Sequence, residues 1–191
     1  MAHGWAVMSG AVVAFTDLVG PTTVTAGEGS TWHGGASPST SPPISFGYQW
    51  RVNGQNQSGA TQSAYSNGFA LPGAYTVGAI MTYADGVADT NTVTVTSVFG
   101  VHISGPNPLD PNQGEGHYEA VVPGGVAPFS YQWWLDGNPT STSSSFDSFI
   151  GMPSSTHELK LRVADAQSHV ANTTMSVFVT AGGTCLQPPC P

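Results

Sequence analysis

The chain has 191 residues, of which 7% are charged, and its 11 acidic and 3 basic side chains give a formal net charge of −8. So few basic residues argue against binding to nucleic acid or to an anionic membrane through a basic patch, and we expect no nucleic-acid partner. The longest apolar runs are far shorter than the ~20 residues that span a bilayer, so we also expect no membrane insertion.

Residues 1–13 are predicted to form an apolar N-terminal arm. They contain Trp5 and several aliphatic residues, and nothing later in the chain repeats them. The start lacks the Lys or Arg and the small-residue cleavage site of a signal peptide. Three explanations stay open: a leader already removed, a leaderless route of release, or a viral protein. We expect the arm to pair with its own sheet or, as the favoured alternative, to dock on another subunit by strand addition.

The first repeat is predicted to span residues 14–98. Polar and apolar residues alternate there with the period of two that is typical of strands. In residues 46–52 the aromatic side chains and Val52 share one predicted face around Trp50, and Asn53-Gly54 supplies a tight turn with positive φ. Further strands are predicted around residues 75–81 and 92–96.

The second repeat is predicted to span residues 99–181. The segment that begins at Phe46 returns 83 positions later (129 − 46) at Phe129, so that Trp133 takes the place of Trp50. Strands are predicted around residues 159–163 and 173–179. In the first of these, the apolar residues alternate with three charged residues that we expect to be exposed, Glu158, Lys160 and Arg162.

Clusters of Gly, Pro, Asn, Asp and Ser interrupt this alternation about every 8–12 residues, which is typical of short antiparallel strands in a sandwich. We therefore predict an all-β fold of two tandem immunoglobulin-like antiparallel β-sandwiches, with Trp50 and Trp133 as core anchors. The two repeats are joined by a short link, which favours a stiff pair of domains.

The order of motifs resembles the bacterial and phage immunoglobulin-like domains, including those called PKD-like. It consists of Gly-Pro, Gly-Glu-Gly, an aromatic-x-Tyr-Gln-Trp strand, an Asn-Gly or Asp-Gly turn, Ala-Asp and a Thr/Val-rich last strand, over about residues 14–180. The resemblance implies spacers, adhesins, binding modules or virion decorations, and fixes no single function. The chain departs from antibody domains because it has no inter-sheet cysteine pair. We therefore expect Trp50 and Trp133 to pack on aliphatic side chains.

Residues 182–191 are predicted to be a C-terminal tail rich in Cys and Pro. Cys185 and Cys190 are close enough in the sequence to close a small disulfide ring in an oxidising compartment. The alternative is a pair of free thiols. Two cysteines without a nearby histidine provide half of a tetrahedral ligand set, which argues against a metal site.

No catalytic motif is present, and we predict that the chain is not an enzyme and needs no cofactor. The 6 histidines are scattered without a ligand-like pair. Asp85 and Asp89, in one turn, and Asp165 and Glu119 elsewhere are the candidate carboxylates for a structural calcium ion. It is disfavoured because the chain has no Asp-x-Asp-x-Asp run, so we predict no metal.

Trp134 is the strongest candidate for a contact residue. The alternation that buries Trp133 sends Trp134 outward, and Arg51 holds the equivalent place in the first repeat. An outward Trp is a frequent anchor for a protein interface or for a sugar ring. We therefore predict protein or glycan contacts at Trp134, Trp5 and Arg51. The alternative for Trp134 is that a loop or the other domain covers it.

The features together favour a non-enzymatic structural or adhesive protein, extracellular or on a virion surface. Its expected partners are copies of itself or another surface or capsid protein, with a glycan as a further candidate. The competing hypothesis is a carbohydrate-binding or spacer module of a larger secreted enzyme or adhesin; a solitary enzyme is a third. Two Asn-x-Ser/Thr sequons, at Asn56 and Asn172, leave glycosylation open.

Overall fold

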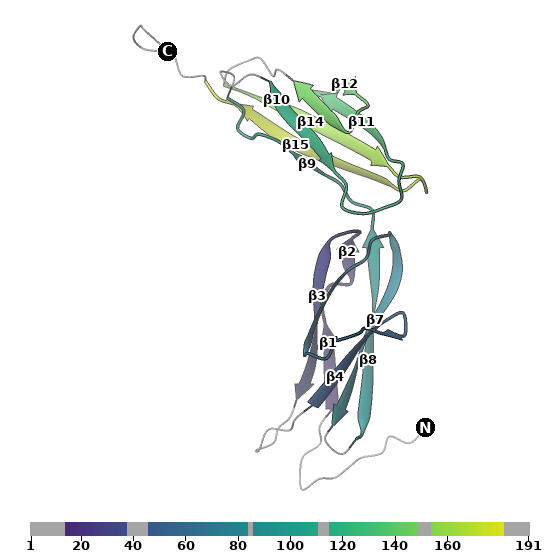
Figure 1. Cartoon of the computed structure of the whole chain (residues 1–191). Coiled ribbons are helices and arrows are strands. Elements are labelled where there is room, and N and C mark those ends of the chain that lie inside the picture. Colours follow the sequence, from purple (N-terminus) through teal and green to yellow (C-terminus); the bar gives the residue numbers. More distant parts are fainter. Residues whose placement is uncertain (1–13, 38–45, 84–85, 111–114, 149–153, 182–191) are drawn as a thin grey trace. The chain divides into compact units, whose positions relative to one another are not determined.

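The computed structural model describes residues 14–37, 46–83, 86–110, 115–148 and 154–181. All regular elements in these ranges are β-strands, which form two compact units, Met1–Val98 and Phe99–Pro191. Each unit has two sheets (Figure 1). The predicted all-β fold of two tandem sandwiches is confirmed. Within these ranges there is no helix of the length and apolarity needed to cross a membrane.

The first unit pairs a three-stranded sheet, in the order β1-β3-β6, with a five-stranded sheet, in the order β2-β8-β7-β4-β5. Its strands are β1 (Ala14–Val19), β2 (Thr23–Thr25), β3 (Gly29–Ser37), β4 (Phe46–Val52), β5 (Gln55–Asn56), β6 (Ala64–Gly68), β7 (Gly73–Tyr83) and β8 (Ala88–Val98).

The second unit pairs a three-stranded sheet, in the order β13-β10-β9, with a four-stranded sheet, in the order β12-β11-β14-β15. Its strands are β9 (His102–Ser104), β10 (Gly116–Val121), β11 (Ser130–Leu135), β12 (Asn138–Ser141), β13 (Ser145–Ser148), β14 (Ser155–Ala164) and β15 (Val170–Val179).

One strand pairing in each unit is parallel, which the sequence did not indicate. β2 pairs with β8 in parallel, and Leu109 forms an isolated parallel bridge to Val179 at the corresponding place in the second unit. The backbone of Leu109 is held there by hydrogen bonds to Phe178 and Thr180. The segment between β1 and β3 in the first unit, and the segment between β9 and β10 in the second, therefore join the sheet that holds the last strand of their unit.

The alternation predicted for the central strands is the one observed. In β14, Leu159, Leu161 and Val163 are fully buried, while the charged residues between them are exposed. In β7, Val77 and Met81 are fully buried. Period two therefore places one face of each central strand in the core and the other at the surface.

Trp50 and Trp133 are fully buried, as predicted for core anchors. Each indole also satisfies its polar atom: Nε1 of Trp50 donates to the Gln62 carbonyl at 2.8 Å, and Nε1 of Trp133 donates to the Ser143 carbonyl at 2.9 Å. The acceptors lie on the segments that lead toward β6 and β13. Each Trp therefore ties a connecting segment to the core as well as filling it.

The indoles share their cores with aliphatic side chains, as expected, and each also packs on an aromatic ring. Trp50 stacks on Tyr65 of β6 with ring centroids 5.4 Å apart, and Trp133 stacks on Phe146 of β13 at 6.0 Å. In both units the second ring comes from the sheet opposite the Trp. An aromatic pair thus spans the two sheets of each unit.

The Gln of the Tyr-Gln-Trp motif has a structural role, as its Trp does. Nε2 of Gln49 donates to the Trp50 and Gln57 carbonyls, and Nε2 of Gln132 donates to the Trp133 and Ser141 carbonyls. The amide therefore ties each central strand to the segment that follows its turn. This role accounts for the repetition of Gln without any functional site.

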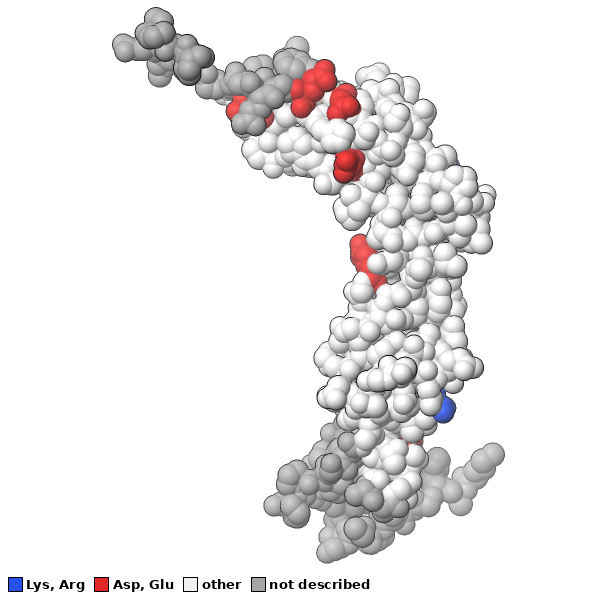
Figure 2. Space-filling view, viewed as in Figure 1, with Lys and Arg blue, Asp and Glu red and all other residues white. Residues whose placement is uncertain are grey.

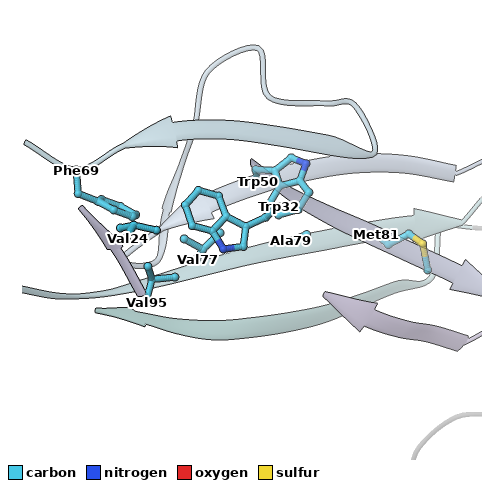
Figure 3. Packing of buried hydrophobic residues seen from close by; sticks show 8 residues of the cluster. All are labelled: Val24, Trp32, Trp50, Phe69, Val77, Ala79, Met81 and Val95. Atoms are coloured by element: carbon cyan, nitrogen blue, oxygen red, sulfur yellow. The ribbon is translucent and has the colours of Figure 1, made fainter. Parts of the chain in front are cut away.

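Trp32 and Tyr118 are fully buried core residues that the sequence analysis missed. Trp32 lies beside Trp50 in the first core (Figure 3). Its Nε1 donates to the Pro21 carbonyl at 3.1 Å, and the Tyr118 hydroxyl donates to the Pro106 carbonyl at 3.3 Å. In each unit, a buried aromatic side chain therefore donates a hydrogen bond to the Pro of the repeated Gly-Pro motif.

The predicted turns are present at both Asn53-Gly54 and Asp136-Gly137. All four residues have positive φ, between 49° and 80°. Oδ1 of Asn53 accepts a hydrogen bond from the Thr76 N–H at 2.9 Å, and Oδ1 of Asp136 accepts one from the Glu158 N–H at 2.9 Å. The same turn and the same cross-strand bond therefore recur with Asn in one unit and Asp in the other.

Candidate functional site

Trp134 lies on β11, where its cross-strand neighbours are Pro139 on β12 and Lys160 on β14. Its side chain is half-buried on the outer face of the sheet, with the Lys160 Nζ 5.5 Å from the centroid of its ring. This distance is within the range of a cation–π contact. Trp134 is therefore neither sealed in the core nor fully exposed, because a side chain of its own sheet covers part of it.

The outer face around Trp134 also holds two of the three basic residues of the chain. Lys160 and Arg162 are exposed on β14, with Glu158 beside them, and Phe178 of β15 is 47% exposed at one end. Register places Thr174 opposite Lys160 and Asn172 opposite Arg162. We define the Trp134 face as the set Trp134, Glu158, Lys160, Arg162, Asn172, Thr174 and Phe178.

Arg51, the counterpart of Trp134 in the first unit, is bound within its own turn. Its Nε donates to Oδ1 of Asn56 at 2.7 Å, and its neighbour on β7 is Gly78. It is half-buried. The first unit therefore places an internally paired cation where the second places an indole beside two cations.

The three-stranded sheet of the second unit carries a different group of charges on its outer face. His117 and Glu119 on β10 are exposed, and Asp147 on β13 lies directly opposite His117. Nδ1 of His117 is 2.5 Å from the Asp147 carboxylate, and its Nε2 is 3.3 Å from that of Glu119. Hydrogen bonds to Asp147 and Glu119 raise the pKa of His117. We call the set His117, Glu119 and Asp147 the acidic face. Figure 2 shows further acidic side chains on the visible side of this unit.

Asp165 is a buried carboxylate with four hydrogen-bond donors. Its Oδ1 accepts from the backbone N–H groups of Gln167 and His169, and its Oδ2 accepts from the Val126 N–H and pairs with the His169 ring. Burial alone raises the pKa of Asp165, but the hydrogen bonds from His169, Val126 and Gln167 outweigh it and lower that pKa to about 2. These donors give Asp165 a structural role in its turn.

Asp136, His157 and Ser155 form a hydrogen-bonded relay at one end of the second core. Nδ1 of His157 is 2.7 Å from Oδ2 of Asp136, and Nε2 of His157 is 2.8 Å from Oγ of Ser155. The His157 side chain is 19% exposed and Ser155 is half-buried. The hydrogen bond from His157, followed by that from the Glu158 N–H, lowers the pKa of Asp136.

Several predicted site residues lie outside the described residues: Trp5, Cys185, Cys190 and Asp85. Of the candidate calcium ligands, Asp89 accepts a hydrogen bond from the Thr90 N–H, Asp165 has the four donors above, and Glu119 pairs with His117. The described ranges bring together no group of three or more His, Cys, Asp or Glu side chains that could hold a metal ion.

No protein-family model matches the chain, and none of the curated proteins compared with it does. Among solved structures, the chain is similar to fibronectin(III)-like modules of Clostridium thermocellum CbhA (15% identity, 94% of this chain and 99% of that chain, TM-score 0.34). It is also similar to three N-terminal domains of the bacteriophage RB49 Highly Immunogenic Outer Capsid protein (12%, 85% and 59%, 0.37).

A third similar structure is the Bacteroides ovatus SGBP-B protein of a mixed-linkage glucan utilization locus, in complex with a heptasaccharide (12% identity, 90% of this chain and 48% of that chain, TM-score 0.35). Identities and TM-scores this low assign no function to the present chain. The two β-sandwiches are established by the sheets described above.

The Ser155 relay was missed because its members come from two distant segments. A signal was nevertheless present: Ser155 and His157 are two residues apart on one strand, so they share a face, and the repeat offset places the Asp136 turn beside them. The first unit has Tyr75 at the place of His157. Comparison of the two repeats therefore isolates the residues that only the second unit has.

Proposed function

We propose that this protein is a non-enzymatic structural or adhesive protein of a virion surface or another extracellular surface, which assembles from copies of itself. We also propose that its two domains belong with the bacterial and phage immunoglobulin-like domains that their motifs resemble. The Trp134 face is the proposed contact surface, and its proposed occupant is the acidic face of a second copy.

The observation that carries this proposal is the placement of opposite charges on the two outer faces of one unit. The chain has a formal charge of −8 and only 3 basic residues, yet Lys160 and Arg162 stand together beside the one outward indole of β11. The acidic face lies on the other sheet. Two different faces of one subunit therefore match each other, as a heterologous contact requires.

The indole gives such a contact its apolar centre. Trp is enriched at the energetic centres of interfaces because it buries a large area with few rotatable bonds. Lys160 already lies over the Trp134 ring. A carboxylate of a second copy, such as that of Glu119, completes a column of carboxylate, ammonium and ring. A heterologous contact of this kind repeats into a ring or a filament.

Glycan binding is the second candidate, and the outward indole supports it. A sugar ring stacks on an open face of an aromatic ring, but the Lys160 ammonium lies over the Trp134 ring at 5.5 Å. A sugar that stacks on the same side has to displace this cation–π contact. The arrangement therefore favours a protein partner over a neutral sugar.

The test is sedimentation of Trp134→Ala against the unmodified protein over a range of concentrations. We expect the substitution to weaken self-association by about 2 kcal/mol, or roughly thirtyfold in Kd, with both units still folded. The matched control is Leu71→Ala, which removes a 43% exposed apolar side chain from the first unit. Unchanged association of Trp134→Ala, or an equal loss in the control, contradicts the proposal.

Binding of Trp134→Ala and Leu71→Ala to a glycan array distinguishes glycan binding from self-assembly. Loss of glycan retention in Trp134→Ala together with unchanged sedimentation supports a carbohydrate module and rejects assembly through this face. Electron microscopy of the native source completes the comparison, because it distinguishes a free protein from a filament or a particle-bound component.

A further inference from the structure

We propose that Ser155 is an activated nucleophile that accepts an acyl group from an ester, with His157 as its base and Asp136 as the group that orients His157. The proposal goes beyond structural assembly and does not depend on it. It rests on a Ser–His–Asp relay with Oγ to Nε2 at 2.8 Å and Nδ1 to Oδ2 at 2.7 Å. Both distances are within hydrogen-bond reach, as the activation of a serine requires.

The contacts of Asp136 decide which ring nitrogen of a neutral His157 carries the proton. Oδ1 of Asp136 accepts the Glu158 N–H at 2.9 Å, and Oδ2 faces the imidazole of His157. A carboxylate only accepts, so the proton of a neutral imidazole lies on Nδ1. Nε2 is then the acceptor, and the Ser155 hydroxyl donates to it. This is the direction in which a base removes the hydroxyl proton.

The first unit supplies an internal comparison. At the place of His157 it has Tyr75, which stacks on Phe69 with centroids 4.1 Å apart and donates its hydroxyl to the Leu71 carbonyl. The same end of the sandwich is therefore closed there by an aromatic pair. Since the fold can be closed in this way, the polar relay of the second unit is not required by the architecture.

The proposed reaction transfers one acyl group. Oγ of Ser155 attacks the carbonyl carbon of the ester while its proton passes to Nε2 of His157. The bond between that carbon and the alkoxy oxygen breaks, and an acyl-serine ester remains. The departing oxygen takes the proton from His157 and leaves as an alcohol, or it leaves as a phenolate and His157 passes the proton to water. Rapid turnover needs, in addition, N–H donors aimed at the oxyanion. The relay provides the activated oxygen, so the proposal concerns acylation of Ser155 and not turnover.

The test uses p-nitrophenyl acetate on the full chain, with release of p-nitrophenolate followed by absorbance and the acetylated residue located by peptide mass spectrometry. We expect Ser155 to be acetylated at least about a hundredfold faster than Ser104, an exposed strand serine of the same unit that serves as internal standard. Ser155→Ala should abolish the fast release. Equal rates at Ser155 and Ser104, or fast release that persists in Ser155→Ala, overturn the proposal.

Two further variants separate activation from a structural role. Asp136→Asn should keep the turn, because Asn53 makes the same turn and the same bond to a backbone N–H in the first unit. It should nevertheless slow acetylation of Ser155, because an amide no longer fixes the tautomer of His157. His157→Gln removes the base and should slow it at least as much. Acetylation at the original rate in either folded variant overturns the proposal.

Discussion

The Gly-Pro motif provides the sharpest test of how the two cores are built. A Cβ added at Gly20 would lie 2.2 Å from Cδ1 of Trp32, and one added at Gly105 would lie 2.4 Å from Cδ1 of Tyr118. Both rings are fully buried and both are hydrogen-bonded to the carbonyl of the next Pro. Neither ring can move away without losing a packed position and a hydrogen bond.

The overlap between the added Cβ and the ring sets the expected loss of stability. Ordinary contact begins at about 3.4 Å, so Gly20→Ala demands a shift of about 1.2 Å (3.4 − 2.2) in a fully buried indole. Overpacking of a dense core costs about 1–3 kcal/mol, and a shift of this size lies toward the upper end. We therefore expect Gly20→Ala to destabilise the first unit by about 3 kcal/mol. Gly105→Ala should do the same to the second unit.

The assay is hydrogen exchange with mass spectrometry during urea unfolding, because peptides report on each unit separately. The control is Gly29→Ala in the same unit as Gly20, where an added Cβ meets nothing within 4 Å. We expect the control to stay within about 1 kcal/mol of the unmodified protein. If Gly20→Ala is as stable as Gly29→Ala, the seating of Trp32 against the Gly-Pro motif is refuted.

Three other predictions concern the two core Trp residues, the Asp165 turn and the N-terminal arm that the sequence predicts. Trp50→Ala should cost about 3–5 kcal/mol and unfold mainly the first unit, and Trp133→Ala should do so for the second; unfolding of both units together, measured by unit-resolved hydrogen exchange, contradicts this. The pKa of Asp165 is about 2 in the folded protein against an ordinary 3.8. Its contribution to the stability of the second unit should therefore be complete above its ordinary pKa and fall as pH drops toward 2, and acid titration of Asp165→Asn should lack that fall. Deletion of residues 1–13 should abolish attachment to the native assembly while both units stay folded, and undiminished attachment in a pull-down rejects the proposed docking arm.

Local pattern was enough to predict the central and last strands of each unit and the two Trp anchors, because period-two alternation and positive-φ turns are properties of neighbouring residues. The aromatic partners Tyr65 and Phe146 were not predictable in this way. They come from the opposite sheet, and pairing between sheets is set by the packing of segments distant in sequence. Trp32 and Tyr118 could have been predicted as an equivalent pair, since they stand 86 positions apart (118 − 32) and so follow the repeat.

The candidate site was predictable only in part. Alternation correctly sends Trp134 to the outer face of β11, but its half-buried state depends on Lys160, which register on β14 brings beside it. The Ser155 relay likewise depends on the pairing of β11 with β14, which carries the Asp136 turn to His157. Sequence indicates which face a side chain takes, while register decides what it meets there.

The most direct test of assembly through opposite faces is an exchange of their charges. One variant carries Lys160→Glu and Arg162→Glu, and the other carries Glu119→Lys and Asp147→Lys. Each variant alone has two faces of like sign and should sediment as a monomer, whereas an equimolar mixture should associate through the face that each retains. Association of either variant alone at the level of the unmodified protein, or a mixture that stays monomeric, contradicts the account.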